Sequence, residues 1–396
     1  MANVSSSNGL EKRPKLRFPG FDEPYKQCRI GDIYAERSQR GASDIELLSV
    51  TMNDGVKPRS EIEGKDNSSE DKSNYKIVRK GDMVYNSMRM WQGANGISPC
   101  DGIVSPAYTV LMPKQAINNG YFAALFKSAN LINEFRKNSQ GMTSDTWNLK
   151  YPQIETIKIQ IPSVSEQDKV SELFGVLDAR IVAQAQLVES LKKYKRGLLS
   201  QLIAQKKAFD TSGEWKTVKL GHIFKERTER AKGNETLLAV TISNGVQRRD
   251  EIDLKDNSSD DKSKYKCVYI GDIAYNTMRM WQGASGVSPY NGIVSPAYTI
   301  VTPIRPDLHN MTFWAYYFRY SPLVQTFQKY SQGLTSDTWN LKFPQFSEIA
   351  VTMPPISEQD KIAECLSVFD EHCKCEEEKL QELFQVRISL LQQLFI

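Results

Sequence analysis

The chain has few residues whose spacing would support catalysis. An acid followed two residues later by a lysine occurs at Glu63 and Lys65, and again at Asp253 and Lys255. Many magnesium-dependent nucleases use this pair, but the upstream aspartate that accompanies it is missing. We therefore interpret both segments as solvated loops, with a duplicated nuclease as the alternative.

Other catalytic signatures are also missing from the sequence. It has neither the glycine-rich phosphate loop nor the dinucleotide-binding glycine pattern, and no Asn-Pro-Pro-aromatic tetrad of amino-methyltransferases. The three histidines do not recur between the two halves described below, which argues against a histidine base. A metal site is suggested by Cys365, His372, Cys373 and Cys375, yet residues two apart on a helix do not face each other. We therefore predict no catalytic residues, no metal and no cofactor.

A first polar segment occurs twice and contains side chains that suit base edges. Arginine pairs well with guanine, and asparagine or glutamine with adenine. The alternative is that its methionines and tryptophan are core residues and that its arginine pairs with an acid. The candidates are Asn86, Arg89, Trp91 and Gln92, with Asn276, Arg279, Trp281 and Gln282 in the second copy.

Two further polar segments also occur twice. One is rich in small hydroxyls that suit phosphate contacts, although a helix cap and a packed corner would explain it too. The other is a lysine-containing loop whose acids, Asp66, Glu70 and Asp71, argue against a plain phosphate clamp. The candidates in the hydroxyl segment are Gln140, Thr143, Ser144, Gln332, Thr335 and Ser336. Those in the lysine loop are Lys65, Asn67, Lys72, Lys255, Asn257 and Lys262.

An internal duplication organises the whole chain. Residues 31–109 align without a gap to residues 221–299, with 47 identities in 79 positions. Residues 139–153 then match residues 331–345 at 13 of 15 positions. Identity is highest in the polar segments and low at 37–46 and 110–138. Packing alone would protect the apolar positions instead, so this pattern favours a shared function for the polar segments.

Each repeat predicts a mixed α/β domain. Runs of β-branched residues at 47–52, 76–78, 83–85 and 103–112 predict strands, and alternating isoleucines at 157–161 predict another. Apolar residues between 121 and 135 follow helical spacing.

The segment after each domain predicts one long helix. Residues 165–204 contain no proline, and their apolar positions keep a spacing of three and four. About 40 residues at 1.5 Å each make a helix of roughly 60 Å. Ser165 and Asp168 resemble a capping box at its start, and a second helix begins at Ser357. Because each has a narrow apolar stripe, we expect the two helices to pair, antiparallel, as in a coiled coil.

Composition bounds the remaining possibilities. With 40% hydrophobic and 25% charged residues the chain reads as a globular protein, and no run of 18 apolar residues predicts a membrane span. The six cysteines do not recur between the repeats, which predicts free thiols and a cytoplasmic location. A net charge of +4 means that a DNA-binding surface must concentrate its positive charge.

The order of these elements resembles the specificity subunits of Type I restriction–modification enzymes. The entry sequence around Phe18-Pro19-Gly20 and the doubled phrase Ile161-Pro162, then Ser165-Glu166-Gln167, are typical of that family. The resemblance covers nearly the whole chain from residue 15. It implies two similar target-recognition domains separated by a long antiparallel two-helix coiled coil, related by a pseudo-twofold repeat. The implied boundaries are 1–14 (disordered lead), 15–162 (first domain), 163–206 (first helix), 207–354 (second domain) and 355–396 (second helix).

The resemblance also implies a function. Each domain would read one half of a bipartite site on double-stranded DNA, while the helices dock two methyltransferase subunits and motor–nuclease subunits join that complex. Since both copies carry the same polar segments, we expect an inverted-repeat target. The alternatives are the nuclease above and a bridging scaffold that does not bind DNA.

Overall fold

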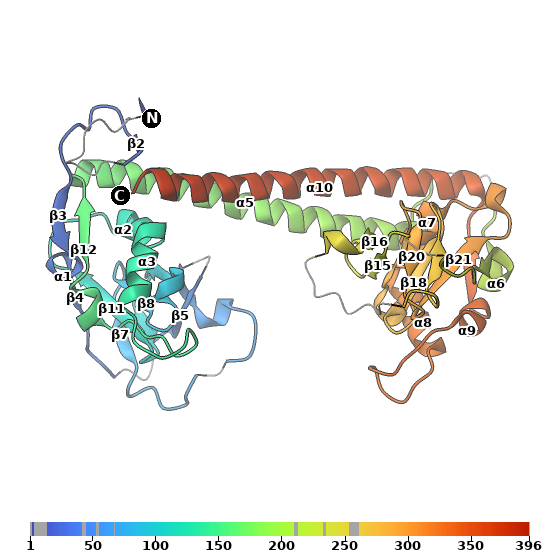
Figure 1. Cartoon of the computed structure of the whole chain (residues 1–396), viewed down its shortest axis with the longest axis horizontal. Coiled ribbons are helices and arrows are strands. Elements are labelled where there is room, and N and C mark those ends of the chain that lie inside the picture. Colours follow the sequence, from blue (N-terminus) through green and yellow to red (C-terminus); the bar gives the residue numbers. More distant parts are fainter. Residues whose placement is uncertain are drawn as a thin grey trace. The chain divides into compact units, whose positions relative to one another are not determined.

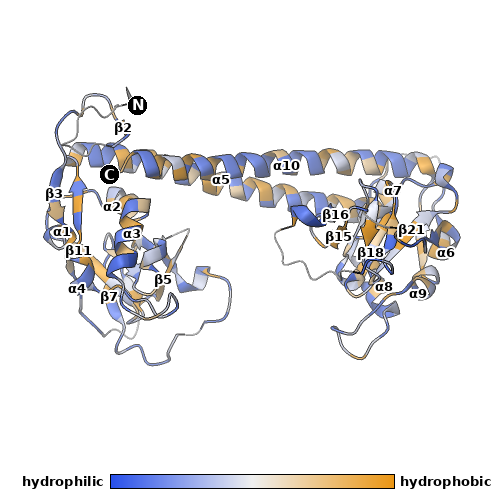
Figure 2. Ribbon diagram, viewed as in Figure 1, coloured by the Kyte–Doolittle hydropathy of each residue, from blue (hydrophilic) through white to orange (hydrophobic). Residues whose placement is uncertain are grey.

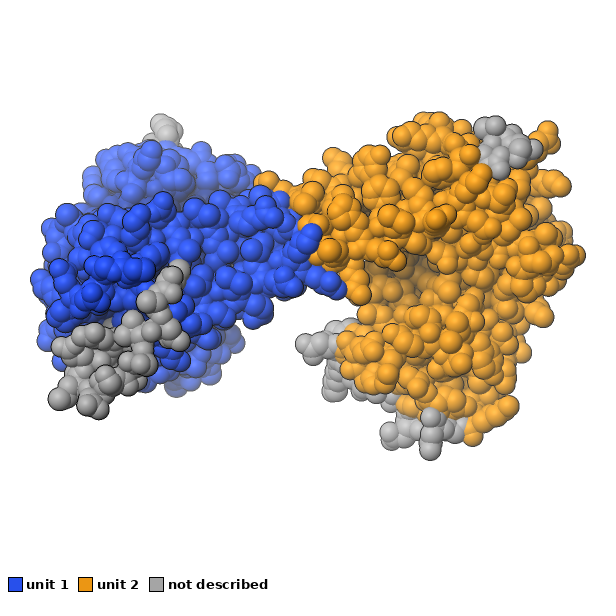
Figure 3. Space-filling view, turned by 90° about the horizontal axis from the view of Figure 1, so that it is seen from above, with its two compact units in different colours: residues 1–185, 378–396 blue, residues 186–377 orange. Residues whose placement is uncertain are grey.

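The computed structural model describes residues 2–3, 14–41, 45–52, 55–66, 68–209, 213–232, 235–252 and 261–395. The chain forms two compact units, one of residues 1–185 with 378–396 and the other of residues 186–377 (Figure 3). Each unit contains one globular domain and a part of each long helix.

A four-stranded antiparallel sheet forms the centre of the first domain (Figure 1). Its strands, in spatial order, are β4 (Tyr34–Glu36), β11 (Tyr108–Pro113), β8 (Met83–Asn86) and β9 (Asn95–Ile97). Two-stranded ladders surround it: β5 (Leu48–Thr51) with β6 (Gly55–Pro58), β7 (Lys76–Val78) with β10 (Gly102–Val104), β3 (Lys26–Arg29) with β12 (Lys158–Ile161), and β1 (Ala2–Asn3) with β2 (Leu16–Arg17). Its helices are α1 (Ile30–Ile33), η1 (Arg59–Glu61), η2 (Met90–Gln92), α2 (Asn119–Leu125), α3 (Ala129–Asn138) and α4 (Tyr151–Ile154).

The second domain repeats this topology. Its central sheet has the order β14 (Phe224–Glu226), β21 (Tyr298–Pro303), β18 (Ile273–Asn276) and β19 (Ser285–Val287). The ladders are β15 (Leu238–Thr241) with β16 (Gly245–Arg248), β17 (Lys266–Val268) with β20 (Gly292–Val294), and β13 (Lys216–Lys219) with β22 (Ala350–Met353). The helices are α6 (Leu220–Ile223), η3 (Arg249–Glu251), η4 (Met280–Gln282), η5 (Pro306–Leu308), α7 (Met311–Tyr317), α8 (Ser321–Tyr330) and α9 (Phe343–Ser347).

The central sheet buries both of its faces. Because side chains alternate along a strand, Met83 and Tyr85 of β8 join an aromatic core with the helices. Val84, between them, joins a smaller valine-rich core with the surrounding ladders. The second domain divides its core in the same way, with Tyr275 in the aromatic cluster and Ala274 in the smaller one. Figure 2 shows hydrophobic residues concentrated on these sheets.

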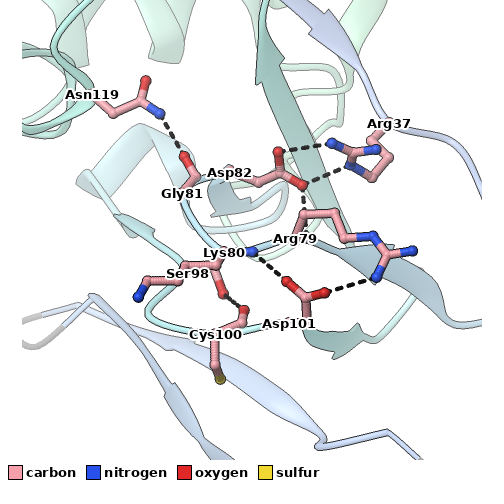
Figure 4. A network of polar contacts seen from close by, with 9 residues as sticks. All are labelled: Arg37, Arg79, Lys80, Gly81, Asp82, Ser98, Cys100, Asp101 and Asn119. Atoms are coloured by element: carbon pink, nitrogen blue, oxygen red, sulfur yellow. Dashed lines mark hydrogen bonds and ion pairs between the residues drawn. The ribbon is translucent and has the colours of Figure 1, made fainter.

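An ion pair fixes the turn that leads into β8 (Figure 4). Arg37 donates two hydrogen bonds to Asp82, at 2.7 and 3.1 Å, and the same carboxylate accepts the N–H of Arg79. Asp101 accepts the N–H of Lys80 and the Arg79 guanidinium, and these bonds lower the pKa of its carboxyl. The second domain keeps the first pair as Arg227 and Asp272. The start of the central strand is therefore held in place in both copies.

The predicted long helices are α5 (Val164–Ile203) and α10 (Ile356–Gln393). In the first unit the rings of Phe174 and Phe395 stack with their centroids 5.9 Å apart. The Arg387 guanidinium forms an ion pair with the Asp178 carboxylate, with an N–O distance of 2.6 Å. Residue numbers rise along one helix as they fall along the other, so the helices run antiparallel.

The second unit shows the same direction. Lys192 pairs with Glu377 at 2.6 Å, and Lys195 pairs with Asp370. The predicted antiparallel pairing is therefore confirmed in each unit, and Figure 2 shows the mixture of polar and apolar residues along both helices.

The repeated Glu-Gln-Asp sequence fastens each long helix to the domain that precedes it. Glu166, 1% exposed, accepts two hydrogen bonds from the buried Arg17 at 2.9 and 2.8 Å. Gln167 accepts the N–H of Asn118 and donates to the carbonyl of Pro162. Asp168 accepts the Asn118 side-chain amide at 2.7 Å. The long helix is thus bonded to the residue that caps α2.

This arrangement corrects the predicted capping box. Helix α5 begins at Val164, and the first amides bond to the carbonyl of Ser163, so Ser165 lies inside the helix. Asp168 bonds to Asn118 of the domain and does not turn back on the helix start. The sequence pattern was local, whereas the partner of Asp168 lies 50 residues away.

Two predicted elements are divided in the structure. The strand expected at 103–112 is two strands, β10 and β11, because the chain turns at Pro106, where the N–H of Tyr108 bonds to Ser105. A proline lacks the N–H that a continuous ladder needs. The helical spacing over 121–135 belongs to α2 and α3, and Ser128 caps the second of them.

Three other expectations concern the termini, the cysteines and the membrane. Residues 1 and 4–13 of the predicted disordered lead lie outside the described residues. All six cysteines are free. Among the described residues, no helix combines the length and the apolar character that crossing a membrane requires.

The ion pair at the helix start can be tested with Glu166→Ala. Leaving the buried Arg17 unpaired should destabilise the first domain by about 3–5 kcal/mol. Hydrogen exchange followed by mass spectrometry measures this, with the second domain as an internal reference. Glu172→Ala is the control, since its pair with Lys169 is exposed and should be worth less than about 1 kcal/mol. Equal losses for both variants would contradict the role of Glu166.

Candidate nucleic-acid interface

A tight turn follows the central strand β8 and exposes an arginine. The Oδ1 of Asn86 accepts the N–H of Met88, and the fully buried Met90 anchors the 3-10 helix η2. Gly93 then adopts φ +84°, a conformation that favours glycine. Arg89 and Gln92 are exposed. Within the described part of the chain the Arg89 guanidinium has no acidic partner. The alternative that this arginine pairs with an acid is therefore not observed.

The second domain forms the same turn. Asn276 accepts the N–H of Met278, Met280 is buried, and Arg279 and Gln282 are exposed. We call residues 86–93 and 276–283 the arginine turns.

The hydroxyl-rich segment forms a short loop that we call the finger loop, residues 139–148 and 331–340. Its ends are joined by two backbone hydrogen bonds between Gln140 and Asn148, at 3.0 and 2.8 Å. Thr146 accepts the N–H of Thr143 and donates to its carbonyl. Gly141 has φ +138°, and a Cβ there would lie 2.6 Å from the Thr146 carbonyl oxygen. The second finger loop has equivalent bonds.

Two tryptophans bring the finger loop and the arginine turn together. Trp91 of the turn and Trp147 of the finger meet edge to face, with ring centroids 5.1 Å apart. The N–H of Leu149 also bonds to the carbonyl of Ser87 at 2.8 Å. The Arg136 guanidinium lies 6.0 Å from the centroid of the Trp91 ring. Two polar segments that are about 50 residues apart in the sequence are therefore neighbours.

The second unit repeats this contact without the arginine. Trp281 and Trp339 also meet at 5.1 Å, and Leu341 bonds to Thr277 at 2.9 Å. Both Trp91 and Trp281 donate their indole N–H within the arginine turn, to Met88 and Met278. These rings therefore join the loops, and their N–H groups are already used.

The predicted residues of the finger loops are all exposed: Gln140, Thr143, Ser144, Gln332, Thr335 and Ser336. Two features were missed in the sequence. An exposed lysine follows each finger loop, Lys150 and Lys342, and each finger has an exposed apolar residue at its tip. The repeat could have revealed both, because the lysine is identical in the two copies and the apolar position holds Met142 in one and Leu334 in the other.

The lysine loops give a different result. The Lys72 ammonium donates to Ser68 at 2.7 Å and to the carbonyl of Ser69, and it lies 4.9 Å from the Tyr75 ring centroid. Lys262 lies similarly over Tyr265, at 5.1 Å. The Lys72 ammonium therefore bonds within its own loop, while Lys65 is exposed. Asn67, Lys255 and Asn257 lie outside the described residues.

The structure describes only the first of the two acid–lysine pairs. Glu63 and Lys65 are exposed on a loop, and Asp253 lies outside the described residues. No group of histidine, cysteine and acidic side chains in the described residues could hold a metal ion. On α10, Cys373 is buried and Cys375 is exposed, as expected for residues two apart on a helix.

In the comparison with known protein families, one family model matches two separate segments of the chain. The family model described as Type I restriction modification DNA specificity domain matches residues 23–193 and again residues 212–385. Among solved structures, the S subunit of a Type I restriction-modification system from M. genitalium is similar, with 14% identity, a TM-score of 0.57 and coverage of 97% of this chain and 99% of that one. A structure from work on complex assembly and conformational transition of the type I R-M system has 13% identity, a TM-score of 0.58 and coverage of 95% and 98%. At these identities the structures show a shared fold.

Gly141→Ala tests whether the finger loop is rigid. The substitution forces a Cβ into an unfavourable conformation and against the Thr146 carbonyl, at a cost of about 1–3 kcal/mol. Hydrogen exchange at the amides of Gln140 and Asn148 should accelerate accordingly. Gly175→Ala is the control, because a Cβ there meets open space on α5 and should stabilise the helix by about 0.5–1 kcal/mol. Unchanged exchange in the finger would disprove its rigidity.

Proposed function

Because this chain belongs to the Type I restriction modification DNA specificity family, we propose that its arginine turns and finger loops are the surfaces that read DNA. The chain is a specificity subunit with two DNA-recognition domains and is non-catalytic. Each domain would read one half of a bipartite target on double-stranded DNA.

The observation that supports this site best is the tryptophan contact in each domain. Trp91 with Trp147, and Trp281 with Trp339, join two polar loops into one exposed surface with the same 5.1 Å separation. A contact that only stabilised the domain would not require the surrounding polar residues to be the same in both copies.

The side chains on this surface suit both kinds of DNA contact. Arg89 and Gln92 can donate to base edges, where sequence is read. The finger hydroxyls and Lys150 suit phosphates, which fix position and register. Such a cluster also concentrates positive charge locally, as a chain with a net charge of only +4 requires.

Since the same loops occur in both domains, we propose that they read the same half-site and that the target is an inverted repeat. Antiparallel helices support this, because each domain packs on the beginning of one long helix and the end of the other. The first domain contacts Phe174 of α5 and Leu391 of α10, and the second contacts Ile362 of α10 and Leu202 of α5.

The long helices would dock two methyltransferase subunits, and motor–nuclease subunits would join through that complex. Exposed apolar side chains on both helices support a docking role, among them Val176, Val182, Leu187, Val368, Val386 and Ile388. We expect the complex to act in the cytoplasm, where the chromosome lies.

Arg89→Ala and Arg279→Ala test the reading of bases. Each should cost roughly 1–3 kcal/mol of binding free energy and relax specificity at one position of its own half-site. Methylome mapping of a host that expresses the system identifies the target, and binding assays on single-base variants measure the relaxation. In each single variant the other half-site is the control. Equal weakening on every sequence would indicate phosphate contact, and two dissimilar half-sites would contradict the inverted repeat.

Shortening the helices tests whether they set the spacing of the half-sites. Removing seven residues at facing positions of α5 and α10 keeps their pairing and shortens the helical pair by about 10 Å, or roughly three base pairs. The methylated target should acquire a correspondingly shorter spacer. An unchanged spacer would reject this role.

The rival functions have direct tests. A duplicated nuclease would cleave plasmid DNA when the purified chain is given magnesium, and we expect no cleavage. A scaffold without DNA contact would fail to bind any duplex, even with methyltransferase subunits present.

A further inference from the structure

Each finger loop carries a large apolar side chain that no described residue of its own unit covers. Met142 and Leu334 are both 100% exposed. The next most exposed large hydrophobic residue among those described is Val176, at 67%. Isolated apolar residues are common on protein surfaces, but complete exposure at the same position of both domains is not explained by packing.

The fingers are not loose loops. In the first, the Gln140–Asn148 bonds, the Thr143–Thr146 bonds and the edge contact of Trp147 all hold the backbone beneath the tip. Met142 is therefore presented by a braced structure, and the second finger presents Leu334 in the same way.

The repeat separates the role of the tip from that of its neighbours. Residues 139–150 and 331–342 are identical except at one position, where Met142 is replaced by Leu334. The polar residues around the tip are fixed, whereas the tip keeps only its size and its apolar character. A side chain that recognised a partner by hydrogen bonding would not be interchangeable in this way.

We propose that Met142 and Leu334 are wedges that insert between stacked base pairs, one in each half-site. This rests on the proposed DNA-reading function of the same loops. Methionine and leucine are among the apolar side chains that DNA-bending proteins insert into base steps, which unstacks the step and kinks the duplex. A stacked base step offers an apolar surface of any sequence, so Met and Leu serve equally well.

The surroundings of the tip favour DNA over a protein partner. The hydroxyls of Thr143 and Ser144 follow it directly, and an exposed lysine, Lys150, ends the segment. One acid, Asp145, is also present on the loop. Hydroxyls and a cation suit the phosphates on either side of an opened step. Opening a step would also reduce the cost of extruding a base for an enzyme that modifies it.

The test uses the full-length chain with its methyltransferase subunits and duplexes that carry the mapped target. A fluorescent adenine analogue, 2-aminopurine, is placed at successive positions, because its emission rises when it loses its stacking neighbours. The wild-type protein should raise the emission at one step in each half-site. Met142→Ala with Leu334→Ala should abolish this rise and weaken binding by about tenfold. Ile270→Ala is the matched control and should leave both readouts unchanged, because Ile270 is also a large apolar residue, 66% exposed, but lies outside the arginine turns and the finger loops.

The possible failures can be distinguished. If the wild-type complex prefers its target but no step brightens, or if the double alanine variant brightens as the wild type does, the wedge is wrong and the reading function stands. If replacing target thymines by uracil removes the effect of the tips, they contact thymine methyl groups and the wedge is again wrong. If the wild-type complex does not prefer its target to a scrambled duplex, the reading function fails and the wedge with it.

Discussion

The buried glutamate at the start of each long helix is the attachment on which the rest of the structure depends. Glu166 is almost completely buried, so its charge must be compensated, and Arg17 does this with two short hydrogen bonds. Gln167 and Asp168 then bond to the residue that caps α2. A helix whose direction is fixed in this way at its first turn can support both its own domain and its antiparallel partner.

The buried glutamate has a different hydrogen-bond donor in each copy. In the second unit Glu358 accepts the backbone N–H of Phe209 at 3.0 Å, whereas Gln359 and Asp360 repeat the bonds to the capping residue, here Asn310. The copies also differ at the turn into the central strand, where Arg79 and Lys80 are replaced by Tyr269 and Ile270. Structural positions have thus diverged while the finger loops and arginine turns have stayed nearly the same. This contrast supports a shared function for the loops.

The site itself depends on a second interaction, the edge contact between tryptophans. It joins a turn fixed by the central sheet to a finger fixed by its own hydrogen bonds. Neither loop alone combines a free guanidinium, exposed hydroxyls and an apolar tip. Held together, they form the one surface to which we assign base reading, phosphate contact and insertion.

Much of this was determined by the sequence alone. The duplication, the mixed α/β character, the two long helices and the polar segments all follow from local patterns, because periodicity and turn residues act over a few positions. Of the candidates, Arg89, Gln92 and the finger hydroxyls are exposed, as a DNA-binding role requires. The local patterns failed where the partner is distant in sequence, as with the capping box assigned to Asp168.

Only the tertiary structure decided which polar segments share a surface and which side chains are already engaged. Trp91 and Trp147 are neighbours because the arginine turn and the finger loop meet in space, and no local pattern encodes that contact. Lys72 was a candidate DNA-binding residue in the sequence, yet its ammonium bonds to Ser68 of its own loop. The complete exposure of Met142 likewise depends on the surrounding fold, since the sequence states that a side chain is apolar, whereas the packing of distant segments decides whether anything covers it.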